Sequence, residues 1–181
     1  MSFGKIKIKR MKRIALLLIL MVSASIVFAQ DAPMTRKEKK AAQKAGQIEK
    51  TKALVASNAW QFDARQMMPS SGKSRSLTTS YNIVVNDKQL SCYLPYFGRA
   101  YRAEYGSAES PLIFKSEIAD YKVENEKKGA WLIRFKTSNK NDKLDFTLHI
   151  SENGSTSLNI NSTDRQPISF HGDLVEIEEQ K

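Results

Sequence analysis

The stretch from Trp131 to Ile160, WLIRFKTSNKNDKLDFTLHISENGSTSLNI, contains three segments in which apolar and polar residues alternate. A period of two residues is typical of β-strands that have one buried face and one face in water. The polar run 139–142 (NKND) separates the first two segments, and a turn that ends at Gly154 separates the second from the third. The stretch therefore predicts three consecutive antiparallel strands joined by hairpins.

The register of these hairpins can be predicted because the apolar faces of neighbouring strands must match. In the first hairpin, 139–142 is the expected loop. A two-residue turn at Asn153-Gly154 would place the apolar sets of the second hairpin on opposite faces. We therefore expect a three-residue loop, 152–154, with Gly154 in a left-handed conformation. The predicted pairs are Trp131–Ile150, Ile133–Leu148, Phe135–Phe146, Leu148–Leu158 and Phe146–Ile160.

The same alternation recurs in four segments outside this stretch, so seven strands are predicted in all. The four further segments begin at Trp60, Tyr81, Leu90 and Ile168. A third hairpin is expected around 86–89, with Ile83–Cys92 and Tyr81–Leu94 as its pairs. Residues 70–76 are expected to form a loop. The sequence thus indicates a mostly β fold: an antiparallel sheet of seven to eight strands, curled into a sandwich or open barrel, with one N-terminal α-helix.

The N-terminal helix is predicted within a basic segment, 30–57, that precedes a single β domain at 58–181. Thr35 and Glu38 have the spacing of a capping box, and good helix formers follow them. Four apolar residues fall on a thin stripe: Ala41, Ala45, Ile48 and Val55. Two interpretations remain open. The helix either leans this stripe on the domain, or it is a basic arm that contacts anionic lipid, polymer or a protein partner.

Residues 1–29 have the pattern of a cleavable signal peptide. A basic start is followed by an apolar run from Ile14 to Ala29, which ends in Val27-Phe28-Ala29. Sixteen residues of helix reach about 24 Å, which is shorter than the roughly 30 Å core of a membrane. We therefore expect cleavage after Ala29 and export to the periplasm, the cell surface or the medium, with retention as an anchor the less favoured alternative.

The net charge of +10 is unevenly distributed over the 181 residues. The segment 1–29 contributes +6 and 30–54 contributes +4, whereas 55–181 holds sixteen residues of each sign. The β domain is thus neutral, so nucleic-acid binding is not expected, and any membrane contact is expected to be peripheral.

The residue types that carry chemistry are scarce in this chain. One cysteine excludes an intrachain disulfide framework and a cysteine-based zinc site. Cys92 is expected to pack in the core on the same face as Leu90 and Leu94. His149 and His171 are the candidates for a hydrolase, but no nucleophile motif or third metal ligand accompanies them. The sequence therefore predicts no enzyme, no metal and no cofactor.

The segment Tyr93–Tyr105 is the candidate functional site, because it contains five aromatic residues within thirteen positions. Pro95 and Gly98 interrupt the strand pattern, which predicts a structured loop. In one interpretation the rings and arginines form a concave ligand site. In the other, the rings plug the end of a barrel or clamp the crossing between sheets. The candidate binding residues are Tyr96, Phe97, Arg99, Tyr101 and Arg102.

Two sequence motifs stand out: the run Leu94–Tyr101 (LPYFGRAY) and the run Arg165–Gly172 (RQPISFHG), with the Asn153-Gly154 hairpin between them. In these motifs the chain resembles a family of small exported bacterial proteins, DUF4251. The resemblance extends from Ala53 to Asp173. It implies an exported, mostly β protein, and it brings no assigned activity, catalytic residue or cofactor.

Together these patterns predict an exported, non-catalytic binding module that uses the aromatic and arginine loop. The candidate ligands are a glycan, a lipid head group, a peptide or an envelope protein. The alternative is an envelope interaction protein that docks a protein partner or an anionic surface through its basic N-terminal helix.

Overall fold

The structure is a computed structural model that describes residues 35–101 and 110–178. The chain divides into two compact units, 1–41 and 42–181, and each is described by itself. In the first unit the predicted capping box is confirmed. The Thr35 N–H donates to Glu38 Oε2 at 2.8 Å, and the Glu38 N–H donates to Thr35 Oγ1 at 3.3 Å. The predicted signal peptide lies outside the described residues.

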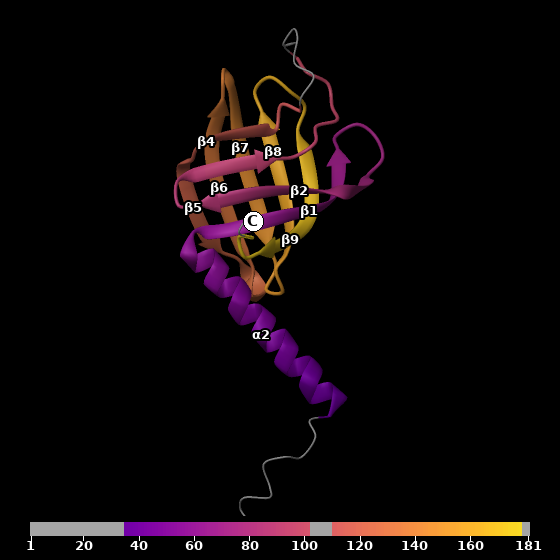
Figure 1. Cartoon of the computed structure of the whole chain (residues 1–181), viewed down its shortest axis with the longest axis vertical. Coiled ribbons are helices and arrows are strands. Elements are labelled where there is room, and N and C mark those ends of the chain that lie inside the picture. The colour runs from indigo at the N-terminus through magenta and orange to yellow at the C-terminus, as the bar shows by residue number, and fades with distance from the viewer. Residues whose placement is uncertain (1–34, 102–109, 179–181) are drawn as a thin grey trace, which may run out of the picture. The chain divides into compact units, whose positions relative to one another are not determined.

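Within the residues that the structure describes, nine antiparallel strands form one sheet in the second unit (Figure 1). They are β1 (Ala59–Pro69), β2 (Arg75–Asn86), β3 (Gln89–Tyr93), β4 (Ile113–Glu117), β5 (Ala119–Asn125), β6 (Trp131–Asn139), β7 (Asp142–Ile150), β8 (Ser155–Ser162) and β9 (Ile168–Val175). Their order in the sheet is β4-β3-β2-β1-β9-β8-β7-β6-β5. A short 3₁₀ helix, η1 (Lys127–Gly129), connects β5 to β6. The predicted mostly β fold, an antiparallel sheet curled into a sandwich or open barrel, is confirmed, and the described residues form nine strands instead of seven or eight.

The predicted registers of the hairpins are confirmed. Phe135 pairs with Phe146, and their rings stack with centroids 4.8 Å apart. Gly154 has φ +86° at the end of its three-residue loop, as expected. The expected loops 139–142 and 86–89 are each shorter than predicted, because their end residues pair: Asn139 with Asp142, and Asn86 with Gln89. The β2–β3 ladder ends at Asn82–Tyr93, so the predicted pair Tyr81–Leu94 falls just beyond it.

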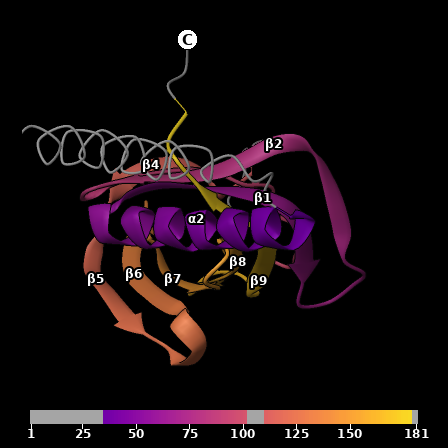
Figure 2. The ribbon, with the colours of Figure 1, turned by 90° about the horizontal axis from the view of Figure 1, so that it is seen from below.

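The two edges of the sheet meet at a corner, because β4 and β5 are consecutive in the chain and separated only by Ile118. At this corner the Thr137 hydroxyl on β6 donates to the Glu117 carbonyl at 2.8 Å and lies 2.6 Å from Ser116 Oγ. Figure 2 shows β1, β2 and β4 on one side of the barrel and β5–β9 on the other. Side-chain contacts therefore replace part of the missing ladder, and the barrel is nearly closed.

The interior is apolar and continuous between the two walls. The largest side chains that are almost completely buried include Trp60, Phe62, Phe135, Phe146, Phe170 and Met67. Met67 reaches the interior because a bulge between Ala64 and Gln66 shifts the alternation along β1. Cys92 is 2% exposed on this inner face, which confirms its predicted core position. Burial raises the pKa of its thiol.

The α-helix, α2 (Arg36–Ser57), buries only Thr51 and Val55. The β7–β8 loop lies directly against the helix at these residues, because a Cβ placed on Gly154 would be 3.2 Å from Thr51 Oγ1. The predicted stripe is therefore only partly right, because Ala45 is exposed and Thr51 is buried. The reason is that the contact comes from the C-terminal half of the helix, where the β7–β8 loop reaches it.

Candidate functional site

The predicted aromatic segment leaves β3 at Tyr93 and continues as a loop up to Tyr101. Pro95 is buried and lacks an N–H, so it suits a position where the ladder ends. A Cβ on Gly98 would lie 2.5 Å from the hydroxyl oxygen of Tyr96. The loop therefore folds tightly over the Tyr96 ring, and a side chain at position 98 would displace the Tyr96 hydroxyl.

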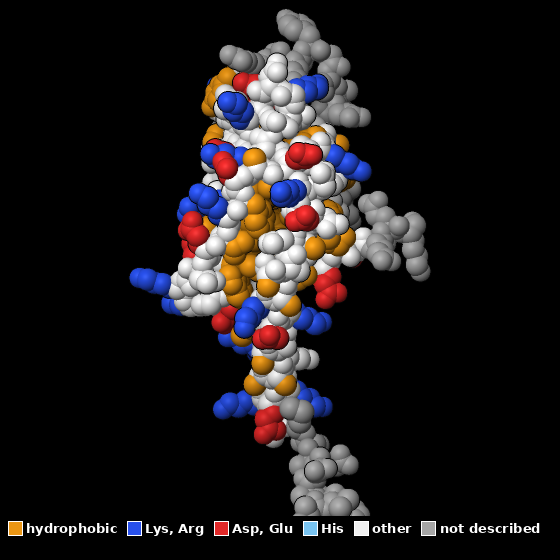
Figure 3. Space-filling view, turned by 90° about the vertical axis from the view of Figure 1, so that its left-hand side faces the viewer, with side chains coloured by type: hydrophobic (Ala, Val, Ile, Leu, Met, Phe, Trp, Pro, Cys, Tyr) orange, Lys and Arg blue, Asp and Glu red, His pale blue; other side chains and the backbone are white. Residues whose placement is uncertain are grey.

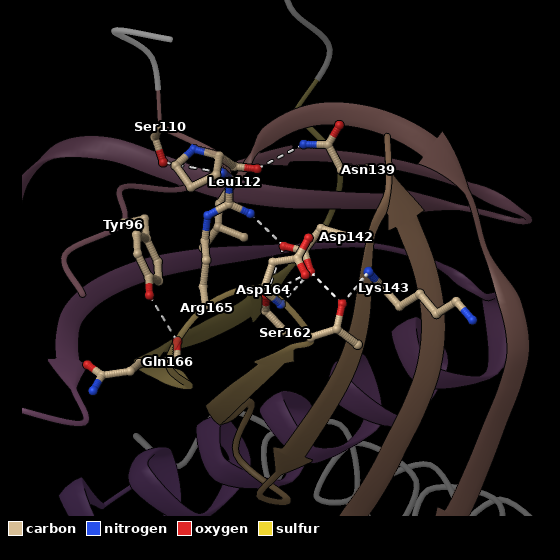
Figure 4. Close-up of polar contacts among 12 residues, drawn as sticks. Tyr96, Ser110, Leu112, Asn139, Asp142, Lys143, Ser162, Asp164, Arg165 and Gln166 are labelled. Carbon is tan, nitrogen blue, oxygen red and sulfur yellow. Dashed lines mark hydrogen bonds and ion pairs between the residues drawn. The ribbon is translucent and has the colours of Figure 1, made fainter. Parts of the chain in front are cut away.

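The side chain of Tyr96 connects this loop to the segment around Gln166. Its ring is half-buried, and its hydroxyl lies 3.1 Å from the carbonyl oxygens of Arg99 and of Gln166, to which it can donate (Figure 4). Burial raises the pKa of the phenol, while the nearby positive charge of Arg165 opposes that rise. Tyr96 thus joins two segments that lie 70 residues apart in the sequence.

The backbone strengthens the same junction. The Tyr101 N–H donates to the Asp164 carbonyl at 2.7 Å, and the Gln166 N–H donates to the Arg99 carbonyl at 3.1 Å. Between these bonds, Ala100 and Arg165 form an isolated antiparallel bridge. The structure therefore brings together the two motifs, Leu94–Tyr101 and Arg165–Gly172, on which the family resemblance rests.

A buried ion pair lies beneath the junction and was missed from the sequence. Arg165 Nη1 is 2.6 Å from Asp142 Oδ2, with side chains only 10% and 5% exposed (Figure 4). The same carboxylate accepts hydrogen bonds from the hydroxyls of Ser162 and Thr163 and from the Asp164 N–H. In the sequence Asp142 is one polar residue of the run NKND, and nothing in that pattern distinguishes it from its neighbours.

Above this anchored base, three of the predicted site residues are exposed. Phe97 is 50% exposed, Tyr101 is 66% exposed, and Arg99 also faces solvent. Arg75 joins them, because its guanidinium carbon lies 4.9 Å from the centroid of the Phe97 ring. Arg75 was expected in a loop but is the first residue of β2. Arg102, the fifth predicted residue, lies outside the described residues.

The surface around Phe97 and Tyr101 has the chemistry of a binding site. An exposed aromatic ring offers an apolar face, and a guanidinium offers several donors in a plane that suit a carboxylate or phosphate. Arg75 already covers one side of Phe97 in a cation–π contact. The arrangement can therefore hold a ligand that combines an apolar face with negative charge.

Other candidate features lie away from this loop. His149 is on the outer face, where its Nδ1 is 3.4 Å from Glu126 Oε1, and His171 is also exposed. A cavity of about 480 Å³ lies outside β5–β8 beside Lys136 and Lys143. Another, of about 580 Å³, lies beside Tyr93 and Glu178.

Within 35–101 and 110–178, no three His, Cys, Asp or Glu side chains are placed so that they could hold a metal ion. In the same residues, no helix combines the length and the apolar character that crossing a membrane requires.

Comparison with known proteins places this geometry in a family context. One family profile, described as "Domain of unknown function (DUF4251)", matches residues 42–174. The crystal structure of a DUF4251 family protein from Bacteroides eggerthii DSM 20697 has a similar fold, with a TM-score of 0.56 over 75% of this chain and 91% of that chain. The two sequences are 16% identical, so this likeness concerns the fold alone. A comparison with curated proteins finds no match.

Proposed function

The chain belongs to the DUF4251 family, a domain family of unknown function, and from this premise we propose that it is an exported, non-catalytic binding module. The family resemblance predicted from the two sequence motifs is confirmed. The proposed ligand-contacting residues are Phe97, Tyr101, Arg99 and Arg75, with Arg102 next to them in the sequence. Tyr96 is proposed as a positioning residue.

One observation carries this proposal: exposed rings stand on a rigidly anchored base. Phe97 and Tyr101 are 50% and 66% exposed, although large aromatic side chains tend to be buried. The loop beneath them is tied by the Tyr96 hydroxyl, by two backbone hydrogen bonds and by the buried Arg165–Asp142 pair. Binding residues on a loop that a scaffold fixes lose little conformational entropy when a ligand arrives.

The chemistry of the surface limits the ligand class. The Arg75 guanidinium over the Phe97 ring, with Arg99 exposed in the same loop, favours an anionic group attached to an apolar face. An acidic glycan, a lipid head group or an acidic peptide has this combination. A chain exported by a cleavable signal peptide would meet all three in the periplasm or at the cell surface.

A thermal-shift screen of the purified protein against peptidoglycan fragments, acidic glycans, acidic peptides and anionic vesicles tests the proposal. A ligand present at ~100 times its dissociation constant adds about 2.7 kcal/mol to the free energy of unfolding, which raises the midpoint by several degrees. We expect Phe97→Ala and Tyr101→Ala each to weaken binding about tenfold or more, because each removes an aromatic contact.

The control is Ile113→Ala, since Ile113 is another exposed apolar side chain, 37% exposed, and lies on β4 outside the aromatic segment. Its substitution should leave the affinity unchanged. Equal binding by the wild type and both ring variants would refute the aromatic site. Tyr96→Phe should lower both stability and affinity, because it releases the loop without removing an exposed ring.

One observation favours a second candidate, docking of a protein partner or anionic surface through α2. This 22-residue helix buries only two residues, and its lysines face solvent. Anionic vesicles are therefore the informative part of the screen. Binding that survives the ring variants but is lost when Lys37, Lys39 and Lys40 are changed to Gln would favour the helix.

A further inference from the structure

The free edge of β5 is a feature that the ligand site does not involve. Among the described residues β5 pairs only with β6, and it is the last strand of the sheet at that side. A bulge between Ala119 and Lys122 interrupts the start of the strand, and Asp120 has φ +53° there. From Lys122 to Asn125 the ladder is regular. This regular part has no further strand beside it among the described residues, so its outer edge is unpaired.

The hydrogen-bond pattern identifies which backbone groups face outward. The Glu126 N–H donates to the Ala130 carbonyl at 2.8 Å, next to β6. Because bonded and non-bonded pairs alternate in an antiparallel ladder, Lys122 and Glu124 also direct their backbone groups to β6. Val123 and Asn125 therefore direct their N–H and C=O groups to the free edge. They are available to a further strand.

The inner face beside this edge is apolar and incompletely covered. Val123 is 42% exposed, although it pairs with Ile133, which is fully buried. Tyr121 and Trp131 are only partly buried against the core. Figure 3 views the molecule from the side on which β5 lies in Figure 1, and hydrophobic side chains form a stripe there. A strand added at this edge would cover part of that apolar surface.

The charged residues of β5 indicate which strand is added at this edge: β5 of a second copy of the chain. If β5 of a second copy pairs antiparallel with Val123 opposite Val123, then Lys122 of each copy lies opposite Glu124 of the other. Sliding by two residues in either direction places Glu124 opposite Glu124 or Lys122 opposite Lys122. The first register thus pairs opposite charges at both positions, whereas each neighbouring register brings one pair of like charges face to face. Asp120 lies in the bulge outside this ladder, 3.5 Å from Lys136 Nζ.

We propose that the chain forms a two-fold symmetric dimer through β5, with Val123 at the axis and two Lys122–Glu124 pairs across the interface. The two nine-stranded sheets then form one continuous sheet, and the free N–H and C=O groups of each β5 edge are hydrogen-bonded to the other copy. The contact is isologous, so it closes on itself and leaves no edge for further growth at β5. Among the described residues Lys122 forms no ion pair within its own copy, which leaves its charge available for the partner.

Sedimentation velocity of the full chain over a range of protein concentrations tests the dimer. We expect a reversible monomer–dimer equilibrium in the wild type. Lys122→Glu and Glu124→Lys should each give monomers, because each places like charges opposite one another. An equimolar mixture of the two variants should form heterodimers, and the double variant with both exchanges should recover the homodimer, since opposite charges then face each other again.

Val123→Pro provides a test that does not depend on charge. It removes an N–H that β6 does not use, so the barrel should stay folded, as judged by its thermal transition, while the dimer is lost. A wild type that stays monomeric at every concentration would overturn the proposal, as would a dimer that survives Val123→Pro. Failure of the mixture and of the double variant to associate, with both single variants folded, would overturn the register.

Discussion

Asp142 and Arg165 show how two side chains hold distant parts of this chain together. Asp142 begins β7, whereas Arg165 lies between β8 and β9 and bridges to Ala100 in the aromatic loop. A buried carboxylate and guanidinium tolerate removal from water only when both are paired and hydrogen-bonded. Here the hydroxyls of Ser162 and Thr163 and the Asp164 N–H also donate to the carboxylate. The pair therefore positions the aromatic loop more than it adds net stability.

Replacing one partner of this pair should be costly. Asp142→Ala leaves the Arg165 guanidinium buried without its counter-charge and is expected to lower the free energy of unfolding by about 3–5 kcal/mol. Asp120→Ala, which breaks the exposed pair with Lys136, should change it by about 0–1 kcal/mol. Urea denaturation of the two variants measures the difference. Similar small losses in both would contradict the structural role given to the buried pair.

Sequence reasoning at the scale of residues succeeded where the local pattern carried the information. The capping box at Thr35 and Glu38 and the left-handed Gly154 follow from spacing and turn geometry. The role of Tyr96 does not, because its acceptor on Gln166 lies 70 residues away. A tyrosine that clamps a loop and one that presents a ring to solvent look the same in a sequence.

The elements of this fold depend on a close approach between β1 and β9. A bulge after Ala64 bends β1, and Gly172 lies opposite Ala64 on β9. A Cβ on Gly172 would lie 1.8 Å from the Asp63 carbonyl oxygen, which no real contact allows. The absent side chain thus lets the two backbones pass each other where the strand changes direction.

Gly172→Ala is therefore expected to destabilise the protein by about 1–3 kcal/mol, because the backbone of Asp63 must move. Gly46 is the matched control, since it lies exposed in α2 with nothing within 4 Å of an added Cβ. Gly46→Ala should stabilise by about 0.5–1 kcal/mol through its helix propensity. Thermal unfolding compares the two, and a neutral Gly172→Ala would show that the contact can relax freely.

The strands that sequence reasoning missed are the two edge strands. Neither β4 nor β5 contains a buried side chain: β4 alternates only between exposed and half-buried residues, and β5 is exposed except at Tyr121. A strand with one neighbour and a partly open inner face has no strong reason to alternate apolar and polar residues. The seven predicted strands are all covered on both sides by other strands. Alternation therefore reports burial within the sheet more than strand formation itself.

At the scale of the whole molecule, burial of a thiol and two phenols keeps these groups neutral up to a higher pH than in the unfolded chain. Burial raises the pKa of the Cys92 thiol above its ordinary 9.0 and the pKa values of Tyr96 and Tyr121 above their ordinary 10.0. At Tyr121 a hydrogen bond from Trp60 Nε1, at 3.1 Å, partly opposes the rise. The unfolded chain therefore releases these protons at lower pH than the folded protein does.

It follows that stability should be full below about pH 9 and should fall as the pH rises through the ordinary pKa values of the thiol and the phenols. Urea midpoints measured from neutral pH to above pH 10 check this. Cys92→Ala should lower stability at neutral pH but flatten the first part of the alkaline decline. A stability that rises between pH 9 and pH 10 would contradict the burial of these groups.

The sequence by itself determined the strand registers, the helix start, the apolar core face and the family, because each depends on spacing between near neighbours or on a short motif. Only the tertiary structure decided how the sheet closes at Ile118 and that the Tyr96 hydroxyl links the aromatic loop to Gln166. It also decided that Arg165 meets Asp142, and that Arg75 lies over Phe97. These features join residues tens of positions apart. Pattern periodicity predicts which face of a strand is buried, but the curvature of the barrel selects which buried faces and loops meet.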